Sequence, residues 1–278
     1  MITRPALARI LASARERNAA VGAFNVILLE HAEAIASGAE QAGVPVVLQI
    51  SENCVRYHGG LAPIALASLE IAKRAKVEVL VHLDHIEDQD LVREGVELGV
   101  DSVMYDGSRL PYDENVRTTR EIADLCHAAG IAVEAELGEV GGKDGVHAPG
   151  ARTDPAEADA FVKATGVDAL AVAVGTSHAM VSRTASVDRA LVSRLRDAVA
   201  VPLVLHGSSG LSDDELRGAV ESGMTKINIS THLNGLFTRS LKQFLDERPD
   251  VVDPRKYVRL GRAAVEEETA RLLRLLAA

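Results

Sequence analysis

The sequence has little cysteine and no long apolar stretch. Its 278 residues include two cysteines, Cys54 and Cys126, which form no metal-binding or redox motif. A disulfide scaffold is not expected at this size, so we expect a cytoplasmic location, where thiols stay reduced. No apolar run approaches the roughly 20 residues of a membrane-spanning helix, and we therefore expect no membrane association.

Basic residues are also in deficit. Lys and Arg number 30 against 40 Asp and Glu, which gives a formal net charge of −10. A general nucleic-acid binder needs a basic face for the phosphate backbone, so this balance argues against that class of protein. It does not exclude a small anionic ligand, because local hydrogen-bond donors can bind one. The composition, 47% apolar and 25% charged, is ordinary for a globular protein with a large core.

A repeated pattern organises the chain: a helical segment ends at a glycine, and a short apolar strand follows. Glycine just past a helix end adopts the left-handed conformation at little cost. Strands that are β-branched and nearly continuously apolar are typical of a parallel sheet covered on both faces. The glycines are Gly43, Gly99, Gly130, Gly166 and Gly223. We expect strands near Val21–Val26, Val44–Ser51, Val77–Asp84, Ser102–Asp106, Ile131–Leu137, Ala169–Gly175, Pro202–His206 and Lys226–Ser230.

Eight strand–helix units without a linker predict that residues 1–278 form one (β/α)8 TIM barrel. More helix precedes the first strand and follows the last, so we expect an N-terminal helix and a C-terminal helical extension. Two helix starts are specific: Ser212 with Glu215 three residues later, and Asp154 before Pro155. A doubly wound open sheet is the alternative arrangement.

In such a barrel the active site lies at the C-terminal ends of the strands. Each expected strand end carries a polar or ionisable group, whereas the strand beginnings are mostly apolar. This asymmetry favours a site over a set of solvated strand ends. The groups are Asn25, Ser51, Asp84 with His85, Asp106, Glu136, His178, His206 and Asn228.

Three histidines stand out among these strand ends. His85, His178 and His206 belong to the third, sixth and seventh strands and could converge across the barrel mouth. Three neutral imidazoles and an open position are typical of a catalytic zinc site. Taken singly, each histidine is more simply explained as a polar strand-end residue. His82, one pleat below Asp84, is interpreted as structural.

The last two strand ends carry "HGSSG" (206–210) and "NIST" (228–231). The loops after strands seven and eight form the usual phosphate site of this barrel. Glycines let the backbone approach a ligand, and Ser and Thr supply hydroxyl and N–H donors. The pattern predicts a phosphate ester beside a metal ion. The glycine-rich segment 138–153, longer than a typical loop, is expected to act as a lid.

Six motifs together resemble one known family: "HLDH", "VEAELG", "GTSH", "PLVLHGSSG", "KINIST" and "DPRKYVRLG". They are similar, in the right order and over almost the whole chain, to the class II, zinc-dependent fructose-bisphosphate and tagatose-bisphosphate aldolases. The resemblance implies a lyase that reversibly cleaves a ketose bisphosphate to dihydroxyacetone phosphate and glyceraldehyde 3-phosphate. It also implies catalytic Zn²⁺, leaves open a second divalent or a monovalent cation, and implies a homodimer or homotetramer.

The resemblance also implies residue roles. Asp84 corresponds to the acid/base that serves the C4 hydroxyl, and His85, His178 and His206 correspond to the zinc ligands. Asp106 and Glu136 resemble carboxylates that bind a second cation or surround the ligands. Arg255 resembles the arginine that meets the second phosphate across a subunit interface. The other implied substrate-binding residues are Asn25, Ser51, Ala179, Gly207, Ser209, Asn228, Ser230 and Thr231.

The chain departs from the family pattern in three places. Ala179 stands where the family often has glycine, and Ser230 stands where Asp or Asn is common. The lid reads "GGKDG", one residue shorter than the usual Gly-Gly-x-Glu-Asp. Asp144 is then the nearest replacement for the Glu that moves the proton at the dihydroxyacetone-phosphate carbon.

Other interpretations stay open. A lysine Schiff base could stabilise the carbanion instead, but Lys76 and Lys226 are interpreted as lying at strand beginnings, which favours the metal route. A metal-dependent hydrolase commonly shows a His-x-His pair on its first strand, and "AFNV" lacks it. A non-catalytic sugar-phosphate-binding protein and an aldolase for a deoxy-gluconate phosphate of inositol breakdown are further alternatives. The two ketose bisphosphates differ only at C4, and the sequence does not choose between them.

Overall fold

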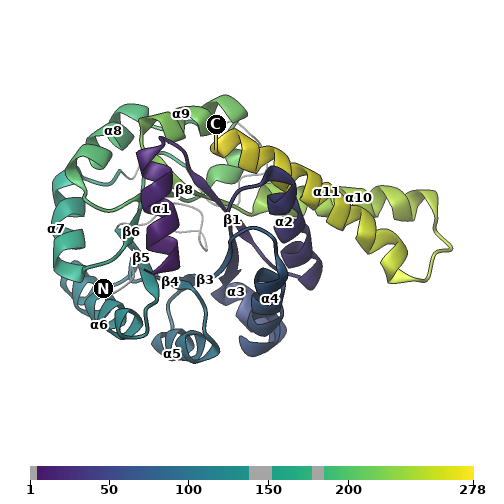
Figure 1. Cartoon of the computed structure of the whole chain (residues 1–278), viewed down its shortest axis with the longest axis horizontal. Helices are drawn as coiled ribbons and strands as arrows, with labels where there is room; N and C mark the ends of the chain where they lie inside the picture. Colours follow the sequence, from purple (N-terminus) through teal and green to yellow (C-terminus); the bar gives the residue numbers. More distant parts are fainter. Residues whose placement is uncertain (1–4, 138–151, 177–184) are drawn as a thin grey trace.

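The computed structural model describes residues 5–137, 152–176 and 185–278. Parallel strands close into a barrel in the order β1 to β8, and β8 pairs with β1 (Figure 1). The predicted (β/α)8 barrel is confirmed, and the closure excludes the doubly wound open sheet. The strands are β1 Val21–Asn25, β2 Val46–Ser51, β3 Val79–Ile86, β4 Ser102–Tyr105, β5 Ala132–Leu137, β6 Ala169–Val172, β7 Leu203–Leu205 and β8 Met224–Ile229.

Helices surround this barrel. Both specific helix starts are confirmed, because Ser212 Oγ accepts the N–H of Glu215 and the Asp154 carboxylate accepts N–H groups of the first turn that follows it. The described helices are α1 Ala6–Glu16, α2 Leu29–Ala42, α3 Glu52–His58, α4 Ala62–Arg74, α5 Gln89–Leu98, α6 Tyr112–Ala128, α7 Pro155–Thr165, α8 Arg189–Ala198, α9 Asp213–Ser222, α10 Thr231–Glu247 and α11 Pro254–Leu276. The five glycines expected at helix ends all have positive φ.

Some strand boundaries differ from the expected ones. β3 continues two residues past Asp84, to Ile86, because Ile86 still pairs with Tyr105 of β4. β8 begins two residues before Lys226, at Met224, which pairs with Leu203 of β7. β6 ends at Val172, three residues before Gly175. These shifts change where a side chain lies along the barrel axis, and for Lys226 the change affects the site.

The barrel interior is apolar at its N-terminal end. The helix α1 covers that end, and its buried face uses the spacing i, i+3, i+4 and i+7 of an amphipathic helix (Figure 1). One apolar cluster joins Leu7, Ile10, Leu11 and Ala14 of α1 to the inward-facing residues Val47, Leu80, Ala132 and Val204. This packing closes one end of the barrel, so a ligand would enter from the other end.

Above this apolar layer the interior becomes polar. Successive side chains of a strand alternate between its two faces, so residues two apart share a face. Two residues beyond Val47, Leu80, Ala132 and Val204 lie the buried polar side chains of Gln49, His82, Glu134 and His206. Lys226 of β8 is also completely buried. The interior therefore places charged groups beneath the mouth at which the strands end.

The C-terminal helices α10 and α11 form a hairpin that projects from one side of the barrel (Figure 1). α11 returns along α2, and the two backbones approach closely at Gly38, where an added Cβ would lie 2.7 Å from the carbonyl oxygen of Glu266. Arg262 pairs with Glu33 at 2.6 Å along the same contact. The predicted C-terminal helical extension is therefore anchored to the barrel through α2.

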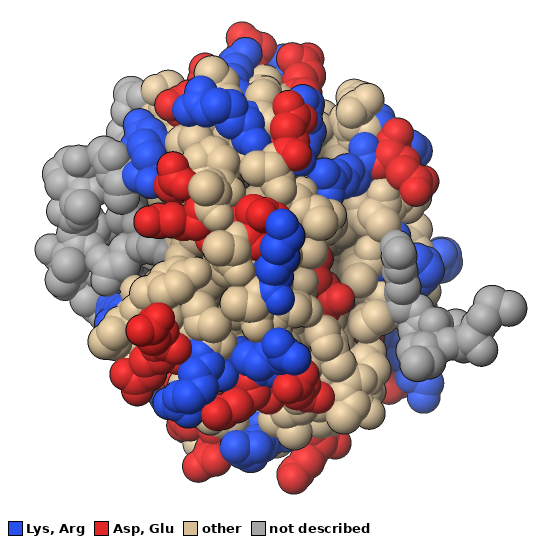
Figure 2. Space-filling view, turned by 90° about the vertical axis from the view of Figure 1, so that its left-hand side faces the viewer, with Lys and Arg blue, Asp and Glu red and all other residues tan. Residues whose placement is uncertain are grey.

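The outer helices carry charges of both signs. Figure 2 shows Lys and Arg interspersed with Asp and Glu over the face at which α7 lies. Within α7 itself, Lys163 pairs with Asp159 at 2.6 Å, four residues apart. None of the helices in the described residues is both long and apolar enough to span a membrane.

Candidate active site

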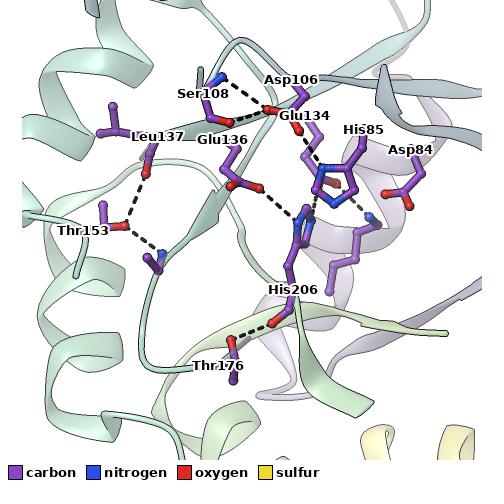
Figure 3. Close-up of polar contacts among 12 residues, drawn as sticks. Asp84, His85, Asp106, Ser108, Glu134, Glu136, Leu137, Thr153, Thr176 and His206 are labelled. Carbon is purple, nitrogen blue, oxygen red and sulfur yellow. Dashed lines mark hydrogen bonds and ion pairs between the residues drawn. The ribbon is translucent and has the colours of Figure 1, made fainter. Parts of the chain in front are cut away.

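Asp84 and His85 are neighbours in β3, and a bulge lets both reach the barrel mouth. In a regular strand, consecutive side chains point to opposite faces. Here the pairing of β3 with β4 shifts register between Leu83 and Ile86, and His85 has a φ of 51°. As a result, Asp84, His85 and His206 each bring a potential ligand atom within 4.8 Å of the others (Figure 3).

Asp84 is held by two amide donors. Asn25 Nδ2 donates to one carboxylate oxygen at 2.9 Å, and Gln49 Nε2 donates to the other at 2.8 Å. Burial would raise the pKa of Asp84, but the electrostatic influence of the neighbouring His85, His206 and Lys226 outweighs it and lowers the pKa to about 2. Asp84 is therefore an ionised carboxylate of fixed orientation, as a base for a substrate hydroxyl requires.

His85 is oriented by Asp106. Its Nδ1 lies 2.8 Å from Asp106 Oδ2, while the other oxygen of Asp106 accepts from the hydroxyl of Ser108 at 2.6 Å (Figure 3). An Nδ1–H donated to Asp106 leaves Nε2 as the lone-pair donor, the arrangement found in metal-ligating histidines. The His85 ring meets the His206 ring edge to face, with 4.6 Å between centroids.

His206 lies between two carboxylates in the barrel interior. Its Nε2 is 3.0 Å from Glu134 Oε1, and its Nδ1 is 3.2 Å from Glu136 Oε2. Burial lowers the pKa of His206, but the hydrogen bonds and charges of Glu134 and Glu136 raise it further, to about 9. This position therefore favours positive charge, whether a proton or a metal ion supplies it.

The donor set fits a divalent cation. Among the residues that the structure describes, two groups of side chains have ligand atoms within 4.8 Å of one another: Asp84 with His85 and His206, and His85 with Asp106 and Glu136. Imidazole nitrogens and carboxylate oxygens are the ligands that zinc takes in catalytic sites. The second group is richer in carboxylate, which suits harder cations as well. The predicted metal residues His85, His206, Asp106 and Glu136 are thus brought together.

The two loops expected to bind phosphate also meet. Gly207 adopts a φ of 67° and opens a short 3-10 turn, Ser208–Gly210. The N–H of Ser230 donates to Ser209 Oγ at 3.3 Å, which links the loop after β7 to the loop after β8. Thr231 is the first residue of α10, so a helix N-terminus faces this junction, an arrangement that favours anions.

The comparisons with known proteins agree with this geometry. Residues 6–278 match the family model of class II fructose-bisphosphate aldolases. The chain belongs to the class II fructose-bisphosphate aldolase family. It is therefore an aldolase, which is a lyase, and the recognition made from the sequence motifs is confirmed.

Solved structures of similar proteins cover the aldolase almost completely. The YdjI aldolase from Escherichia coli K12 shares 32% identity, with a TM-score of 0.85 over 99% of this chain and 97% of that one. A Coccidioides immitis protein, provisionally assigned as a fructose-1,6-biphosphate aldolase, shares 28% identity with a TM-score of 0.88 over 99% and 97% of the two chains. Fructose-bisphosphate aldolase from Campylobacter jejuni, at 22% identity and a TM-score of 0.80 over 97% and 93%, shares the fold.

Two implied substrate-binding residues of the aldolase have other contacts. Ser51 is the N-cap of α3, and its Oγ accepts the N–H of Cys54 at 3.2 Å. Arg255 is highly exposed on the first turn of α11 and pairs with Asp253 at 2.9 Å. Three further predicted residues, His178, Ala179 and Asp144, lie outside the described residues, as does most of the expected lid.

One interpretation of the aldolase sequence is wrong. Lys226 is the third residue of β8 rather than its first, and Lys76 lies between α4 and β3, outside any strand. The reason is that Gly223 ends α9 directly before β8, so the strand starts earlier than its apolar pattern suggested. Lys226 is completely buried, with Nζ 2.8 Å from Glu134 Oε2. This buried, ion-paired amine is poorly placed to form a Schiff base with substrate.

Sequence reasoning missed three buried polar residues beneath the mouth. Gln49 donates to Asp84, Glu134 contacts His206, and Lys226 donates to Glu134. A signal for them existed, because each lies two residues before a predicted site residue on the same strand. The pairs are Gln49 with Ser51, Glu134 with Glu136, and Lys226 with Asn228. His82 is interpreted from the sequence as structural. It is buried, and its Nδ1 lies 2.8 Å from Ser102 Oγ. Burial is the main cause that lowers its pKa to about 3.

Proposed function

We propose that the aldolase catalyses the reversible, zinc-dependent cleavage of fructose 1,6-bisphosphate or tagatose 1,6-bisphosphate to dihydroxyacetone phosphate and glyceraldehyde 3-phosphate. One observation carries the proposal: an ionised, doubly hydrogen-bonded Asp84 lies beside His85 and His206, with ligand atoms within 4.8 Å of one another. A base and a cation site side by side are what aldol cleavage needs.

The imidazoles of His85 and His206, together with His178, would hold the zinc ion. Bound there, zinc supplies a Lewis acid that polarises the substrate carbonyl. Asp106 serves the site by orienting His85, and Asp106 and Glu136 offer oxygens to a second cation. The contact of His206 Nε2 with Glu134 supports the proposal, because a metal-ligating histidine donates the N–H of its other ring nitrogen to a carboxylate or carbonyl.

Asp84 performs the first proton transfer. Its carboxylate takes the proton of the C4 hydroxyl as the C3–C4 bond breaks, and glyceraldehyde 3-phosphate leaves as the aldehyde. The electron pair of that bond stays on C3 of the other fragment. A second acid then protonates C3 to give dihydroxyacetone phosphate. We assign that second role to Asp144, with Glu139 as the competing carboxylate of the same segment.

The phosphate of the dihydroxyacetone end would bind between the loops after β7 and β8. Gly207, Ser209, Ser230 and Thr231 offer N–H and hydroxyl donors there, at the N-terminus of α10. Asn228 Oδ1 is buried and makes no hydrogen bond within the described part of the chain, so it can accept one from a substrate hydroxyl. Asn25, Ser51 and Ala179 are assigned to further substrate contacts.

Arg255 would bind the second phosphate from a neighbouring subunit. The structure supports this assignment in one respect: Arg255 lies on the first turn of α11, along a groove with Glu30 and Glu33 of α2, rather than in the barrel-mouth cluster. A homodimer or homotetramer that places this turn against another barrel would complete the site.

A substrate panel tests the proposal. Purified, zinc-loaded protein is assayed with fructose 1,6-bisphosphate, tagatose 1,6-bisphosphate and a deoxy-gluconate phosphate, with triose phosphate detected by a coupled enzyme. We expect cleavage of one or both bisphosphates. Cleavage of the deoxy-gluconate phosphate alone, or tight zinc-dependent binding of a bisphosphate without turnover, would contradict it.

A further inference from the structure

A buried ion pair lies directly beneath the metal cluster. Glu134 of β5 and Lys226 of β8 are both completely buried, and Lys226 Nζ donates to Glu134 Oε2 at 2.8 Å. The second oxygen of the same carboxylate, Oε1, lies 3.0 Å from Nε2 of His206. The three side chains therefore form a chain from lysine through carboxylate to imidazole. Glu134 and His206 are labelled in Figure 3.

This buried ion pair stabilises the fold little in comparison with apolar side chains of the same volume. Removing two charges from water costs several kcal/mol per ion, and apolar residues of similar volume are often as stabilising. The layer immediately below is filled in that way, by Val47, Leu80, Ala132 and Val204. Charges in the next layer thus call for a role other than packing, and the contact with His206 offers one.

The contact fixes which nitrogen His206 presents to the mouth. A carboxylate accepts hydrogen bonds and donates none, so Glu134 requires an N–H at Nε2 of His206. Nδ1, which lies 3.2 Å from Glu136 Oε2, is then the nitrogen at which a metal ion would take the place of the proton. A ring flip would break the bond to Glu134, and so the carboxylate sets both the tautomer and the orientation of the ring.

Lys226 is what holds Glu134 in this state. Within the described residues, Glu134 Oε1 contacts His206 and Oε2 contacts Lys226. His82 Nε2 lies 3.9 Å from Oε2, which is beyond hydrogen-bond distance. Without the ammonium group, the carboxylate would lose its ion pair and would be free to rotate away from His206.

We propose that Lys226 and Glu134 are positioning residues that fix the tautomer and orientation of His206 and thereby set the affinity of the barrel mouth for its divalent cation. The inference rests on the zinc site of the proposed function. It makes the ion pair part of the metal site, although neither residue need touch the metal or the substrate.

A double substitution separates this role from a purely structural one. The variant Glu134→Leu/Lys226→Met removes both charges together, so it leaves no buried charge uncompensated and should fold with near-normal stability. If Glu134 orients His206, the variant should nevertheless bind Zn²⁺ about 10- to 100-fold more weakly in a chelator competition. Its Co²⁺ form should show an altered d–d absorption spectrum, because a ligand has changed its position.

Two further variants decide between the outcomes. Leu80→Val lies in the apolar layer and should lower stability while leaving zinc affinity within about twofold. His206→Ala should lose zinc affinity more than any other variant. If His206→Ala loses zinc but the double variant keeps wild-type affinity and spectrum, the present inference is wrong and the zinc site stands. If His206→Ala itself keeps zinc, the proposed site and this inference both fail.

Discussion

His85 directly follows Asp84 in β3, and both side chains enter the same cluster because His85 adopts a left-handed φ of 51°. A residue with a Cβ occupies this region at a cost of about 1–3 kcal/mol, and it does so when its surroundings hold it there. Two carboxylates hold this segment. Asp106 fixes the His85 ring at 2.8 Å, and Glu52 of α3 accepts the N–H of Glu87, two residues further along, at 2.7 Å.

Glu52 should therefore affect metal binding without touching the metal. The same oxygen that accepts from Glu87 also accepts the N–H of Asp88 at 3.2 Å, so Glu52 ties the backbone that follows His85 to the start of α3. We expect Glu52→Ala to weaken zinc affinity by about threefold to tenfold, less than loss of a direct partner of a ligand. Glu52→Gln, whose carbonyl can still accept, should lose less.

Arg56 supplies the matched control for Glu52. It pairs with the other carboxylate oxygen of Glu52 at 2.5 Å, and its own side chain is largely exposed. Arg56→Ala should leave zinc affinity unchanged in the same chelator competition, since the tie to the backbone N–H groups remains. Equal losses in Arg56→Ala and Glu52→Ala would show that the charge pair, not the backbone tie, is what matters.

Substitution of Asp84 should impair proton transfer without impairing the binding of zinc or phosphate. Asp84→Ala is expected to keep bound zinc and phosphate affinity but to lower kcat by about 10²- to 10⁴-fold, the usual contribution of a general base. Steady-state kinetics and metal analysis of the same preparation measure both effects. Near-normal turnover would mean that Asp84 supports the site without transferring the proton.

Glu268 of α11 should contribute to the acid sensitivity of the fold. Burial raises the pKa of Glu268, but hydrogen bonds from Arg271 and His232 outweigh it and lower the pKa from 4.5 to about 2. A folded-state pKa below the unfolded one stabilises the fold above the unfolded pKa, and that stabilisation is lost as pH falls toward the folded pKa. Wild-type unfolding free energy should thus fall more steeply between about pH 5 and pH 2 than that of Glu268→Gln.

The contribution of Glu268 to the unfolding free energy at neutral pH should be modest. Because Arg271 is 42% exposed, solvent screens the pair, and we expect Glu268→Gln to lower the unfolding free energy by about 1 kcal/mol. Glu267→Gln removes an exposed charge next in sequence and serves as the control. Urea titrations at several pH values measure the difference. Identical pH profiles for the two variants would refute the assignment.

Gly38 should be essential to the packing of α11 on α2. An added Cβ would lie 2.7 Å from the carbonyl oxygen of Glu266 and 2.9 Å from Thr269 Cβ, and the backbone would have to move. We expect Gly38→Ala to destabilise the fold by about 1–3 kcal/mol, as overpacking usually does. At Gly60 an added Cβ would meet nothing within 4 Å, so Gly60→Ala should change stability little. Thermal melts of both variants compare the two sites.

The sequence predicted the barrel well because helix ends and apolar strands are encoded locally. The mouth residues followed from the rule that active sites lie at strand ends. The ion pair beneath them did not follow, because its two partners are 92 positions apart in sequence and meet through the register of the barrel. A strand pattern shows which face a side chain occupies, but not its height along the barrel axis relative to other strands.

The bulge at His85 could not be predicted from the local sequence pattern either. Alternation assigns Asp84 and His85 to opposite faces of β3, and their convergence depends on the irregular pairing of β3 with β4. Boundary errors at β8 had the same origin, since Met224 joins the strand through its partner Leu203. The pairing with neighbouring strands, rather than the residue types themselves, determines the bulge at His85 and the start of β8.

The dependence of aldol cleavage on the metal tests the central claim most directly. Cleavage of the preferred ketose bisphosphate is measured before chelation, after chelation, and after Zn²⁺ or Co²⁺ is restored, with borohydride added alongside substrate in a parallel sample. The account predicts complete loss on chelation, recovery with metal, and no inactivation by borohydride, because Lys226 is buried and paired with Glu134. Unchanged cleavage after chelation, with covalent inactivation by borohydride, would contradict it.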